Sequence, residues 1–433
     1  MSRSMKDSGI AWIGQVPEHW TVAPVRSVLK EVTAKNIFGK ETTALQFRYG
    51  TIVEKDNFDA TEDEYVARTI RNYTLIYPGV LVLNGLNLNY DFVTKRVALS
   101  RLKGAITSAY MTITPIDTHV LMPEFVEYLF KSYDAKMAFH GMGEGVRKIL
   151  NFNELKRQPI IYPTYTEQKR IVQVLDKKCA EIDTLSNSIQ QQIDTLEQYK
   201  RAVITETVTK GLNPSAPMKD SGIPWIGQIP AHWGKCKIKN ACSLIGSGTT
   251  PDSTVPAFYE DGTVNWIQSG DIYGKLLLTD VSIPISEHAL KSSSALKIYK
   301  APFIVIAMYG GSVGNTAISM IDACTNQACC CLKPNNDTDL KFLFYWINFC
   351  KPDFLFRAEG GGQPNISQNK IKNQILCMPP KSEQQAIAEY LDNKCSKIDT
   401  IIQDKQQQLE KLEQYKKATI FEYVTGKKQV PEV

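Results

Sequence analysis

The sequence lacks the long apolar segments of a membrane protein and the cysteine spacing of a metal or disulfide framework. Its longest apolar run, residues 303–309, is far shorter than the roughly 20 apolar residues that cross a bilayer. The N-terminal residues contain no apolar signal-peptide core. The 10 cysteines form no CxxC pair, and free thiols are typical of intracellular proteins. We therefore expect a cytoplasmic protein with no membrane association and no metal site.

Motifs of catalysis are also missing. The chain has no GK[ST] phosphate-binding loop, no HExxH, no GxSxG and no [DNS]PP[YF] tetrapeptide of the kind that amino-methyltransferases use. A nuclease-like arrangement can be assembled only from Asp353, Asp392 and Lys394, and the last two belong to the charged face of a predicted helix. We therefore predict no catalytic residues. The net charge of +5 is only a weak indication of an anionic partner.

Two long segments of the chain are copies of each other. Residues 166–209 read TEQKRIVQVLDKKCAEIDTLSNSIQQQIDTLEQYKRAVITETVT, and residues 382–425 repeat this pattern without a gap, 216 positions later. Neither copy contains Gly or Pro, so each predicts one uninterrupted helix. A shorter docking motif precedes each globular segment, MKDSGIAWIGQVPEHW from Met5 and MKDSGIPWIGQIPAHW from Met218. The chain is thus two tandem halves, and we interpret His19 and His232 as hydrogen-bonded packing residues.

Apolar residues at seven-residue intervals predict that the long helices pair with each other through a coiled-coil seam. In the first copy the predicted seam consists of Leu175, Ile182, Ile189, Leu196 and Val203, with Leu185 and Tyr199 three positions further on. In the second copy it consists of Leu391, Ile398, Ile401, Leu412 and Tyr415, and it is interrupted by Lys405 and Gln408. We expect Thr166 and Ser382 to be the N-cap residues. An antiparallel pair would bring the tail after Thr425 beside the first docking motif.

The two globular segments differ in sequence but follow one plan. Residues 22–162 and 235–378 consist of short apolar runs separated by turn residues, which predicts β-rich units. Each unit contains one predicted helix, at residues 123–139 and 338–349, followed by a glycine-rich stretch at residues 141–145 and 360–362. We interpret these stretches as mobile loops that let the backbone approach a ligand. A shared frame therefore carries two different readers.

Both globular segments contain clusters of residues that suit nucleic acid. Arg, Asn and Gln can pair with base edges, and Lys and Arg can hold phosphates. Taken singly, each such residue is more often an ordinary surface residue, but two clusters on one frame favour DNA binding. The candidate contact residues are Arg48, Tyr49, Asn84, Asn87, Lys95 and Arg96 in the first segment, and Trp266, Gln268, Ser269, Asp271, Tyr309, Asn326 and Gln327 in the second.

With these residues in place, the chain resembles the specificity subunit of type I restriction–modification systems along essentially its whole length. The resemblance rests on the doubled docking motif, on the doubled EQ-x-x-I…L-x-x-K…IDT…LEQYK pattern, and on the joining tract TKGLNPSAPMKDSG. The second reader matches the commoner pattern of the family, with G-x-x-P at Gly248, WI-x-SGDI from Trp266 and TNQA from Thr325. The first reader departs from that pattern.

The resemblance implies an α+β fold with pseudo-two-fold symmetry, in which two long antiparallel coiled-coil helices join two target-recognition domains. Each domain would read one half of an asymmetric bipartite site in double-stranded DNA. The helices would set the spacing and dock two methyltransferase subunits, and motor-nuclease subunits would complete the restriction enzyme. That holoenzyme, an adenine methyltransferase and ATP-dependent endonuclease, uses S-adenosylmethionine, ATP and magnesium, none of which this non-catalytic subunit would bind.

The domain boundaries predicted from these patterns follow the repeats. Residues 1–163 form the first docking motif and recognition domain, and residues 164–210 form the first helix. Residues 211–380 form the linker, second docking motif and second recognition domain, and residues 381–433 form the second helix and tail. Two alternatives remain open at this point: a coiled-coil scaffold for protein assembly without a DNA role, and a stand-alone DNA-binding regulator.

Overall fold

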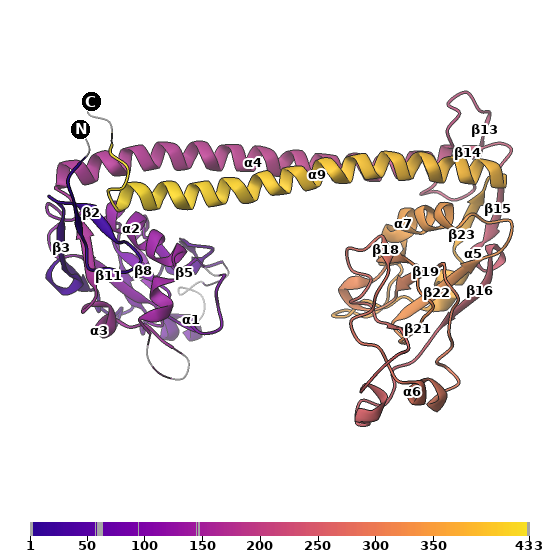
Figure 1. The fold of residues 1–433 in the computed structure, drawn as a ribbon, viewed down its shortest axis with the longest axis horizontal. Helices are drawn as coiled ribbons and strands as arrows, with labels where there is room; N and C mark the ends of the chain where they lie inside the picture. Colours follow the sequence, from indigo (N-terminus) through magenta and orange to yellow (C-terminus); the bar gives the residue numbers. More distant parts are fainter. Residues whose placement is uncertain are drawn as a thin grey trace. The chain divides into compact units, whose positions relative to one another are not determined.

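The computed structural model describes residues 3–56, 58, 64–93, 95–143, 145 and 148–430. The chain divides into two compact units, each with one globular reader and parts of both long helices (Figure 1). Unit 1 comprises residues 1–190 and 406–433, and unit 2 comprises residues 191–405. Among the described residues, none of the helices combines the length and the apolar character needed to cross a membrane.

The reader of unit 1 is built mainly from two four-stranded sheets, in the orders β6-β5-β10-β7 and β4-β11-β8-β9. Its docking motif is the hairpin β1–β2, and β3 pairs with β12 just before the first long helix. The elements are β1 (Met5–Asp7), β2 (Gln15–Pro17), β3 (Thr21–Pro24), β4 (Leu29–Glu31), β5 (Ala44–Arg48), β6 (Thr51–Glu54), α1 (Glu64–Ile70), β7 (Thr74–Ile76), β8 (Leu81–Leu83), β9 (Val97–Leu99), β10 (Gly104–Ile106), β11 (Met111–Pro115), α2 (Pro123–Ala135), α3 (Phe152–Leu155) and β12 (Pro159–Tyr162).

The reader of unit 2 follows the same plan around a five-stranded sheet of order β16-β22-β19-β20-β18. Its hairpin is β13–β14, and β15 pairs with β23 before the second long helix. The elements are β13 (Met218–Asp220), β14 (Gln228–Pro230), β15 (Gly234–Lys237), α5 (Ile238–Ala241), β16 (Cys242–Ser247), β17 (Trp266–Ile267), β18 (Leu277–Leu278), α6 (Glu287–Ser292), β19 (Phe303–Ala307), β20 (Thr316–Ser319), β21 (Cys324–Thr325), β22 (Cys329–Pro334), α7 (Leu340–Phe356), α8 (Gln368–Lys372) and β23 (Ile375–Met378).

The predicted reader helices exist, but their ends differ from the prediction. Helix α2 ends at Ala135 and not at residue 139, because Met137 adopts a left-handed conformation with φ 54° and breaks it. Helix α7 begins at Leu340, since the Asp339 side chain caps it by accepting hydrogen bonds from two backbone N–H groups, and it continues to Phe356. One face of α2 packs into the core, since Phe125, Leu129 and Tyr133 are all buried.

The two repeats form the uninterrupted helices α4 (Tyr165–Lys210) and α9 (Lys381–Val424). The seam between the two helices follows a 4–3 spacing. The first predicted residue of each heptad does lie in the seam, but the residue predicted three positions after it is exposed and lies outside the seam. The side chains of Leu185 and Tyr199 are 50% and 47% exposed, and those of Ile401 and Tyr415 are 45% and 53% exposed. The second seam residue of each heptad lies four positions after the first and three positions before the next, so the two alternate as d and a positions. The buried and half-buried positions are Leu175, Cys179, Ile182, Ser186, Ile189, Ile193, Leu196, Lys200 and Val203, and their counterparts Leu391, Cys395, Ile398, Ile402, Lys405, Leu409, Leu412, Lys416 and Thr419.

The interruption predicted in the second copy is only partly correct. Gln408 is exposed and lies off the seam. Lys405 does occupy a seam position, where it is half-buried and its Nζ donates to Gln192 Oε1 at 2.5 Å. A long aliphatic stem can fill an apolar seam while its amine reaches a polar partner at the edge. The seam therefore tolerates a cation where the first copy has Ile189.

Ion pairs at equivalent positions of the repeat show that α4 and α9 run antiparallel. In unit 2, Lys200 Nζ lies 2.6 Å from Asp399 Oδ1, and Lys405, further along α9, pairs with the earlier residue Gln192 of α4. In unit 1, Lys416 Nζ lies 2.6 Å from Asp183 Oδ1. The second pair is the first one transposed by the repeat, so each unit contains the same antiparallel pairing of the two helices.

The helices begin earlier than the predicted caps, and a different residue anchors them. Thr166 and Ser382 lie inside the helices, whose first hydrogen bonds run to the carbonyls of Thr164 and Pro380. The anchor is a glutamine that both repeats share. The buried Gln168 side chain donates to the carbonyls of Val120 and Pro163 and accepts from Met122 N–H. Gln384 does the same in unit 2, with Asp337, Pro379 and Asp339 as partners.

The glutamate before each glutamine holds the docking motif. Glu167 accepts hydrogen bonds from His19 at 2.9 Å and from the indole N–H of Trp20 at 3.3 Å, and it pairs with Arg3. Glu383 binds His232 at 2.8 Å and Trp233 at 3.2 Å. Both histidines are therefore hydrogen-bonded packing residues, as predicted. Burial raises the pKa of Glu167, but the hydrogen bonds from His19 and Arg3 together outweigh burial and leave this pKa below its usual value.

The chain's tail also takes the predicted position. Within unit 1, Lys427 Nζ donates to the carbonyl of Ile13 at 2.7 Å and to that of Gln15 at 3.4 Å. The end of α9 therefore lies against the first docking motif, and Figure 1 shows both chain ends in this region. The tail begins as the linker after α4 does in the other half, since a Cβ on Gly426 would meet Pro17 and Trp20, and a Cβ on Gly211 would meet Pro230 and Trp233.

The glutamine anchor gives a stability prediction. Replacing Gln168 with Leu removes three hydrogen bonds and leaves one buried N–H and two buried carbonyls without a partner, at about 1–3 kcal/mol for each group that stays unsatisfied. We expect unit 1 to unfold at lower denaturant concentration in Gln168→Leu, and unit 2 in Gln384→Leu, measured by circular dichroism. The matched control is Gln191→Leu, an exposed position of α4, which should change nothing. Equal stability of all three variants would contradict the anchoring role.

Candidate nucleic-acid interface

In unit 1, three of the predicted contact residues come together at the β5–β6 turn. Tyr49 lies at the tip with φ 51° and is 84% exposed. The guanidinium of Arg48 lies 5.7 Å from the centre of the Tyr49 ring. Gly50 has φ +79°, and a Cβ there would lie 2.9 Å from Lys95 Cβ, so glycine lets the turn approach Lys95. An exposed aromatic ring beside a guanidinium, on a turn that approaches an exposed lysine, suits a phosphate backbone and an unpaired or edge-on base.

Arg96 is not available to any ligand, which corrects its prediction as a contact residue. Its side chain is fully buried, and its guanidinium donates to the carbonyls of Asn84, Leu86 and Asp91. Arginine has five N–H donors in a fixed fork, so it can hold a loop by its backbone. Arg96 therefore shapes the loop that presents Asn87, which is exposed with φ 54°.

Asn84 belongs to the start of the same loop. It is half-buried, and its side-chain oxygen accepts from Leu86 N–H at 3.1 Å. This bond closes a local turn through the side-chain oxygen of Asn84. Asn84 and Asn87 thus lie on the loop that Arg96 supports from within, and both remain candidate contact residues.

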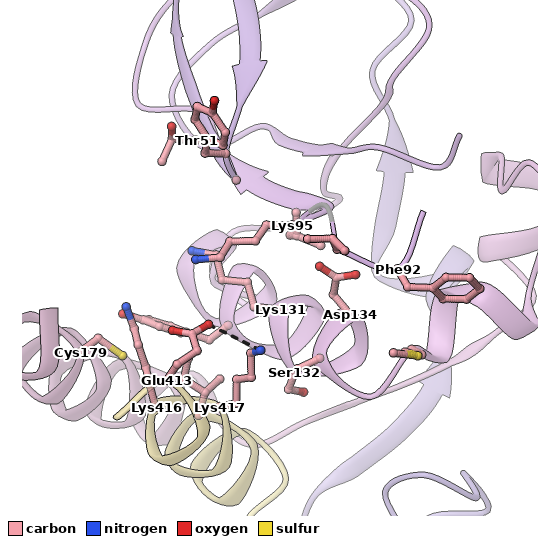
Figure 2. Close-up of a pocket in the computed structure, with 18 of the residues that line it drawn as sticks. Thr51, Phe92, Lys95, Lys131, Ser132, Asp134, Cys179, Glu413, Lys416 and Lys417 are labelled. Carbon is pink, nitrogen blue, oxygen red and sulfur yellow. Dashed lines mark ion pairs between the residues drawn. The ribbon is translucent and has the colours of Figure 1, made fainter. Parts of the chain in front are cut away.

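Tyr49 and Lys95 also line a cavity of about 560 Å³ in unit 1 (Figure 2). The cavity lies between the reader, α2 and both long helices, and Figure 2 shows the amines of Lys95 and Lys131 pointing the same way. The other charged residues of its wall are Lys131, Lys416, Lys417, Asp134, Asp183 and Glu413. These lysines were missed at the sequence level, because α2 and the end of α9 are far from the reader loops along the chain.

The charges in this cavity are mostly paired. Lys131 binds Glu127 at 2.8 Å, Lys416 binds Asp183 at 2.6 Å, and Lys417 lies 3.6 Å from Glu413. Burial raises the pKa of Asp134, which accepts a hydrogen bond from the backbone N–H of Arg96. Lys95 is exposed at the rim and next to the Tyr49 turn. The rim, and not the floor, therefore offers positive charge to a ligand.

In unit 2, three separate sequence motifs converge. Strands β17 and β21 pair in parallel, with Trp266 opposite Cys324, so the turns that follow them emerge at the same edge. Asn326 N–H donates to the carbonyl of Ile267, which ties the TNQA turn to the SGDI turn. A Cβ on Gly248 would lie 1.8 Å from the Thr325 carbonyl, so only glycine lets the GTTP loop join them.

The polar side chains at this junction differ in their exposure. Gln327 is exposed, and its Oε1 accepts from the Thr250 hydroxyl at 2.7 Å. Asn326 is half-buried, and its side-chain oxygen accepts a hydrogen bond from Ala328 N–H at 3.1 Å. Gln268 and Ser269 are half-buried in the neighbouring turn. Together they offer amide and hydroxyl groups of the kind that read base edges.

Two predicted contact residues of unit 2 have structural roles instead. Trp266 is 3% exposed and donates its indole N–H to the Thr249 carbonyl at 3.2 Å. Asp271 is 6% exposed, and its carboxylate accepts from the backbone N–H groups of Gln268 and Ser282. Both residues are therefore buried side chains that stabilise the conformation of the neighbouring loops. Their residue types alone could not reveal this, because burial depends on the tertiary fold.

Tyr309 lies beside the second glycine-rich stretch. It is 39% exposed and forms an antiparallel bridge with Asn365. The residue before it, Met308, donates its N–H to Ala328 of the TNQA turn and accepts from Ile366. The stretch at residues 360–362 is thereby brought near the converging turns. Of the first stretch, residues 141–145, position 144 lies outside the described residues, so the loop behaviour predicted there stays a prediction.

The thiols of the cysteines near this junction are unreactive. Burial raises the pKa of Cys324 to about 11 and that of Cys330 to about 12. Neutral thiols are poor nucleophiles and poor metal ligands. Within the described ranges, no group of three or more His, Cys, Asp or Glu side chains is placed to hold a metal ion. The chemistry that this arrangement offers is hydrogen bonding and phosphate contact.

Comparisons with known proteins agree with this geometry. The family model "Type I restriction modification DNA specificity domain" matches residues 96–195 and 230–411. The putative type I restriction enzyme MjaX specificity subunit of Methanocaldococcus jannaschii is 24% identical over 96% of this chain and 96% of its own length. The MjaVIII specificity subunit of the same organism is 25% identical over 96% of this chain and 94% of its own length.

A solved structure shares the fold. A chain from the work titled "Structural basis underlying complex assembly and conformational transition of the type I R-M system" superposes with a TM-score of 0.72 at 16% identity. The match covers 95% of this chain and 99% of the other. Two readers on a pair of long helices are therefore an arrangement that this chain has in common with a solved protein.

Neighbouring residues 95 and 96 should respond differently to mutation. Lys95→Ala removes an exposed cation, so we expect weaker DNA binding, a log K versus log salt slope smaller by about 1, and unchanged melting. Arg96→Met leaves three carbonyls buried without their donor, so we expect a loss of stability of about 3–5 kcal/mol. Fluorescence anisotropy at several salt concentrations and calorimetry measure the two effects. A Lys95→Ala variant with an unchanged salt slope would exclude this residue from the interface.

Proposed function

Because the chain belongs to the family of type I restriction–modification DNA specificity subunits, we propose that each of its readers recognises one half of an asymmetric bipartite site in double-stranded DNA. The observation that carries this proposal is the contrast between frame and readers. The helices and docking motifs repeat with the same contacts in both units, whereas the loops at the candidate interfaces differ in sequence and geometry. Two readers that have the same helices and docking motifs but different loops fit two different half-sites.

The residues proposed to contact DNA are the exposed and half-buried members of the two clusters. In unit 1 these are Arg48, Tyr49, Asn84, Asn87 and Lys95, and in unit 2 these are Gln268, Ser269, Tyr309, Asn326 and Gln327. Amides would pair with base edges, Lys95 and Arg48 would hold phosphates, and the tyrosines would pack on sugars or bases. Arg96, Trp266 and Asp271 would act only through the loops that they support.

The helices are proposed to hold the readers at a fixed spacing and to dock two methyltransferase subunits. Motor-nuclease subunits would join this assembly in the cytoplasm, where the host DNA lies. S-adenosylmethionine, ATP and magnesium would be held by those other subunits. The sequence itself contains no GK[ST] loop. The domain boundaries at residues 163, 210 and 380 belong to the same proposal.

Exchange of one reader tests its independence. Replacing residues 22–162 with the equivalent segment of a relative should change one half of the methylated DNA motif and leave the other half as it was. The reason is that the two readers share a supporting frame but no reading loops. Sequencing of methylated bases in cells that express the chimaera with its methyltransferase subunit gives the readout. A change in both halves, or in neither, would contradict two independent readers.

The coiled-coil seam allows a test of the helices as a ruler. Inserting one heptad into each helix at the level of residues 190 and 406 keeps the 4–3 seam in phase and lengthens each helix by about 10 Å. Since B-DNA rises 3.4 Å per base pair, the unspecified gap in the methylated motif should grow by about three base pairs. The control inserts seven residues into the exposed linker at residue 214. Full activity with an unchanged gap in the heptad variant would exclude the ruler.

A further inference from the structure

The connection between β8 and β9 in unit 1 has a counterpart in unit 2. The strand order β4-β11-β8-β9 corresponds to β16-β22-β19-β20, and both final pairs are antiparallel. Each connection ends at the same position of its reader helix, six residues after the tyrosine that binds the long helix. There Asp134 of α2 accepts from Arg96 N–H, and Lys351 of α7 donates to Asn315. The two connections therefore occupy equivalent places in the two readers.

The two connections present different side chains to solvent. In unit 2 the connection consists of residues 308–315, MYGGSVGN, which include three glycines. In unit 1 the corresponding segment is longer and begins with residues 84–93, NGLNLNYDFV. At the end of this segment the side chains of Phe92 and Val93 are 57% and 92% exposed. We name these two residues the apolar tip. The frame is shared, but unit 2 has glycine and serine where unit 1 has the apolar tip.

The segment that carries the apolar tip is held firmly by the rest of the reader. Leu88 is buried in the core of unit 1, and a Cβ on Gly85 would lie 2.1 Å from the Leu150 carbonyl oxygen. The Phe92 ring stacks on the His140 ring, with 5.2 Å between the ring centres and 12° between the planes. Exposed apolar side chains that lie together mark a binding surface, and a loop that is already ordered loses little entropy when it binds.

The charges around the apolar tip favour DNA as its partner. Phe92 and Val93 line the same cavity as Tyr49 and Lys95 (Figure 2). Lys95 is exposed at this rim, and Arg48 lies beside the Tyr49 ring. Duplex DNA offers both kinds of complementary surface, since its phosphates attract the cations and the faces of two adjacent base pairs can enclose an apolar side chain.

We propose that the apolar tip is a wedge that enters one base step of the half-site read by unit 1 and kinks the duplex there. This inference rests on the proposed function and deepens it. Pyrimidine–purine steps unstack most readily, so unit 1 would select part of its half-site through the deformability of a step as well as through base edges. Unit 2, with glycines at the equivalent place, would read its half-site without this wedge.

The test uses the full chain with the methyltransferase subunit of the same system, without S-adenosylmethionine, on a duplex that carries its methylated motif. Single nicks are placed at successive steps of both half-sites, because a nick lowers the cost of a kink. One variant carries Phe92→Ala and Val93→Ala, and a second carries Val93→Ala alone, at a nearly fully exposed position. The matched control is Phe38→Ala, since Phe38 is also exposed and lies 6.0 Å from a lysine amine, that of Lys40. Fluorescence anisotropy gives each affinity, and thermal melting checks each fold.

For the unmodified chain and for Phe38→Ala, we expect a nick at one step of the unit 1 half-site to raise the affinity about tenfold. Nicks in the other half-site should leave the affinity unchanged. The gain should fall below about twofold in the double variant and be intermediate in Val93→Ala, with unchanged melting.

A gain that persists in the double variant, or that is equal in both half-sites, would overturn the wedge. It would also be overturned if the double variant kept the gain but lost the methyltransferase subunit, because the apolar tip would then bind protein. If the unmodified complex bound the motif no better than unrelated DNA, the proposed function itself would be refuted, and the wedge with it.

Discussion

The pairing of α4 with α9 through their heptad seam is the constraint on which the rest of the molecule depends. Each helix continues for more than 40 residues without a glycine or proline to end it, so its apolar stripe must find a partner. The chain supplies that partner as a copy of the same helix. Antiparallel pairing of two copies imposes an internal two-fold relation, which the Lys200–Asp399 and Lys416–Asp183 ion pairs record.

Two residues in the first turn of each long helix hold the reader in the same way in both units. Glu167 fixes the docking hairpin and Gln168 fixes the loop before α2, and Glu383 and Gln384 repeat both tasks. The reader helices then lie on the seam's flank through equivalent tyrosine–aspartate bonds. With the frame fixed at these points, the loops of each reader can vary without disturbing the other. This arrangement fits the proposal of one shared frame with two separate sequence preferences.

The repeat allowed much of the frame to be predicted, whereas the site required the fold. Helix existence, antiparallel pairing and the tail's position follow from a pattern that occurs twice. The second seam position of each heptad could not be predicted in this way, because Leu185 and Tyr199 are as apolar as true seam residues. Only burial in the fold distinguishes these two residues from Cys179 and Lys200. Similarly, Lys95 and Arg96 are adjacent and alike in charge, yet the loop geometry exposes one and buries the other. The cavity lysines come from elements remote in sequence and had no local signal.

The most direct test of this account is the methylation pattern of DNA from cells that express the unmodified chain with its methyltransferase subunit, read by single-molecule sequencing. Two unlike readers joined by one pair of helices, as we propose, predict one motif with two different specified halves, separated by a gap of constant length in which every base is tolerated. A single contiguous motif, a palindromic one, or a gap that varies from site to site would contradict the account.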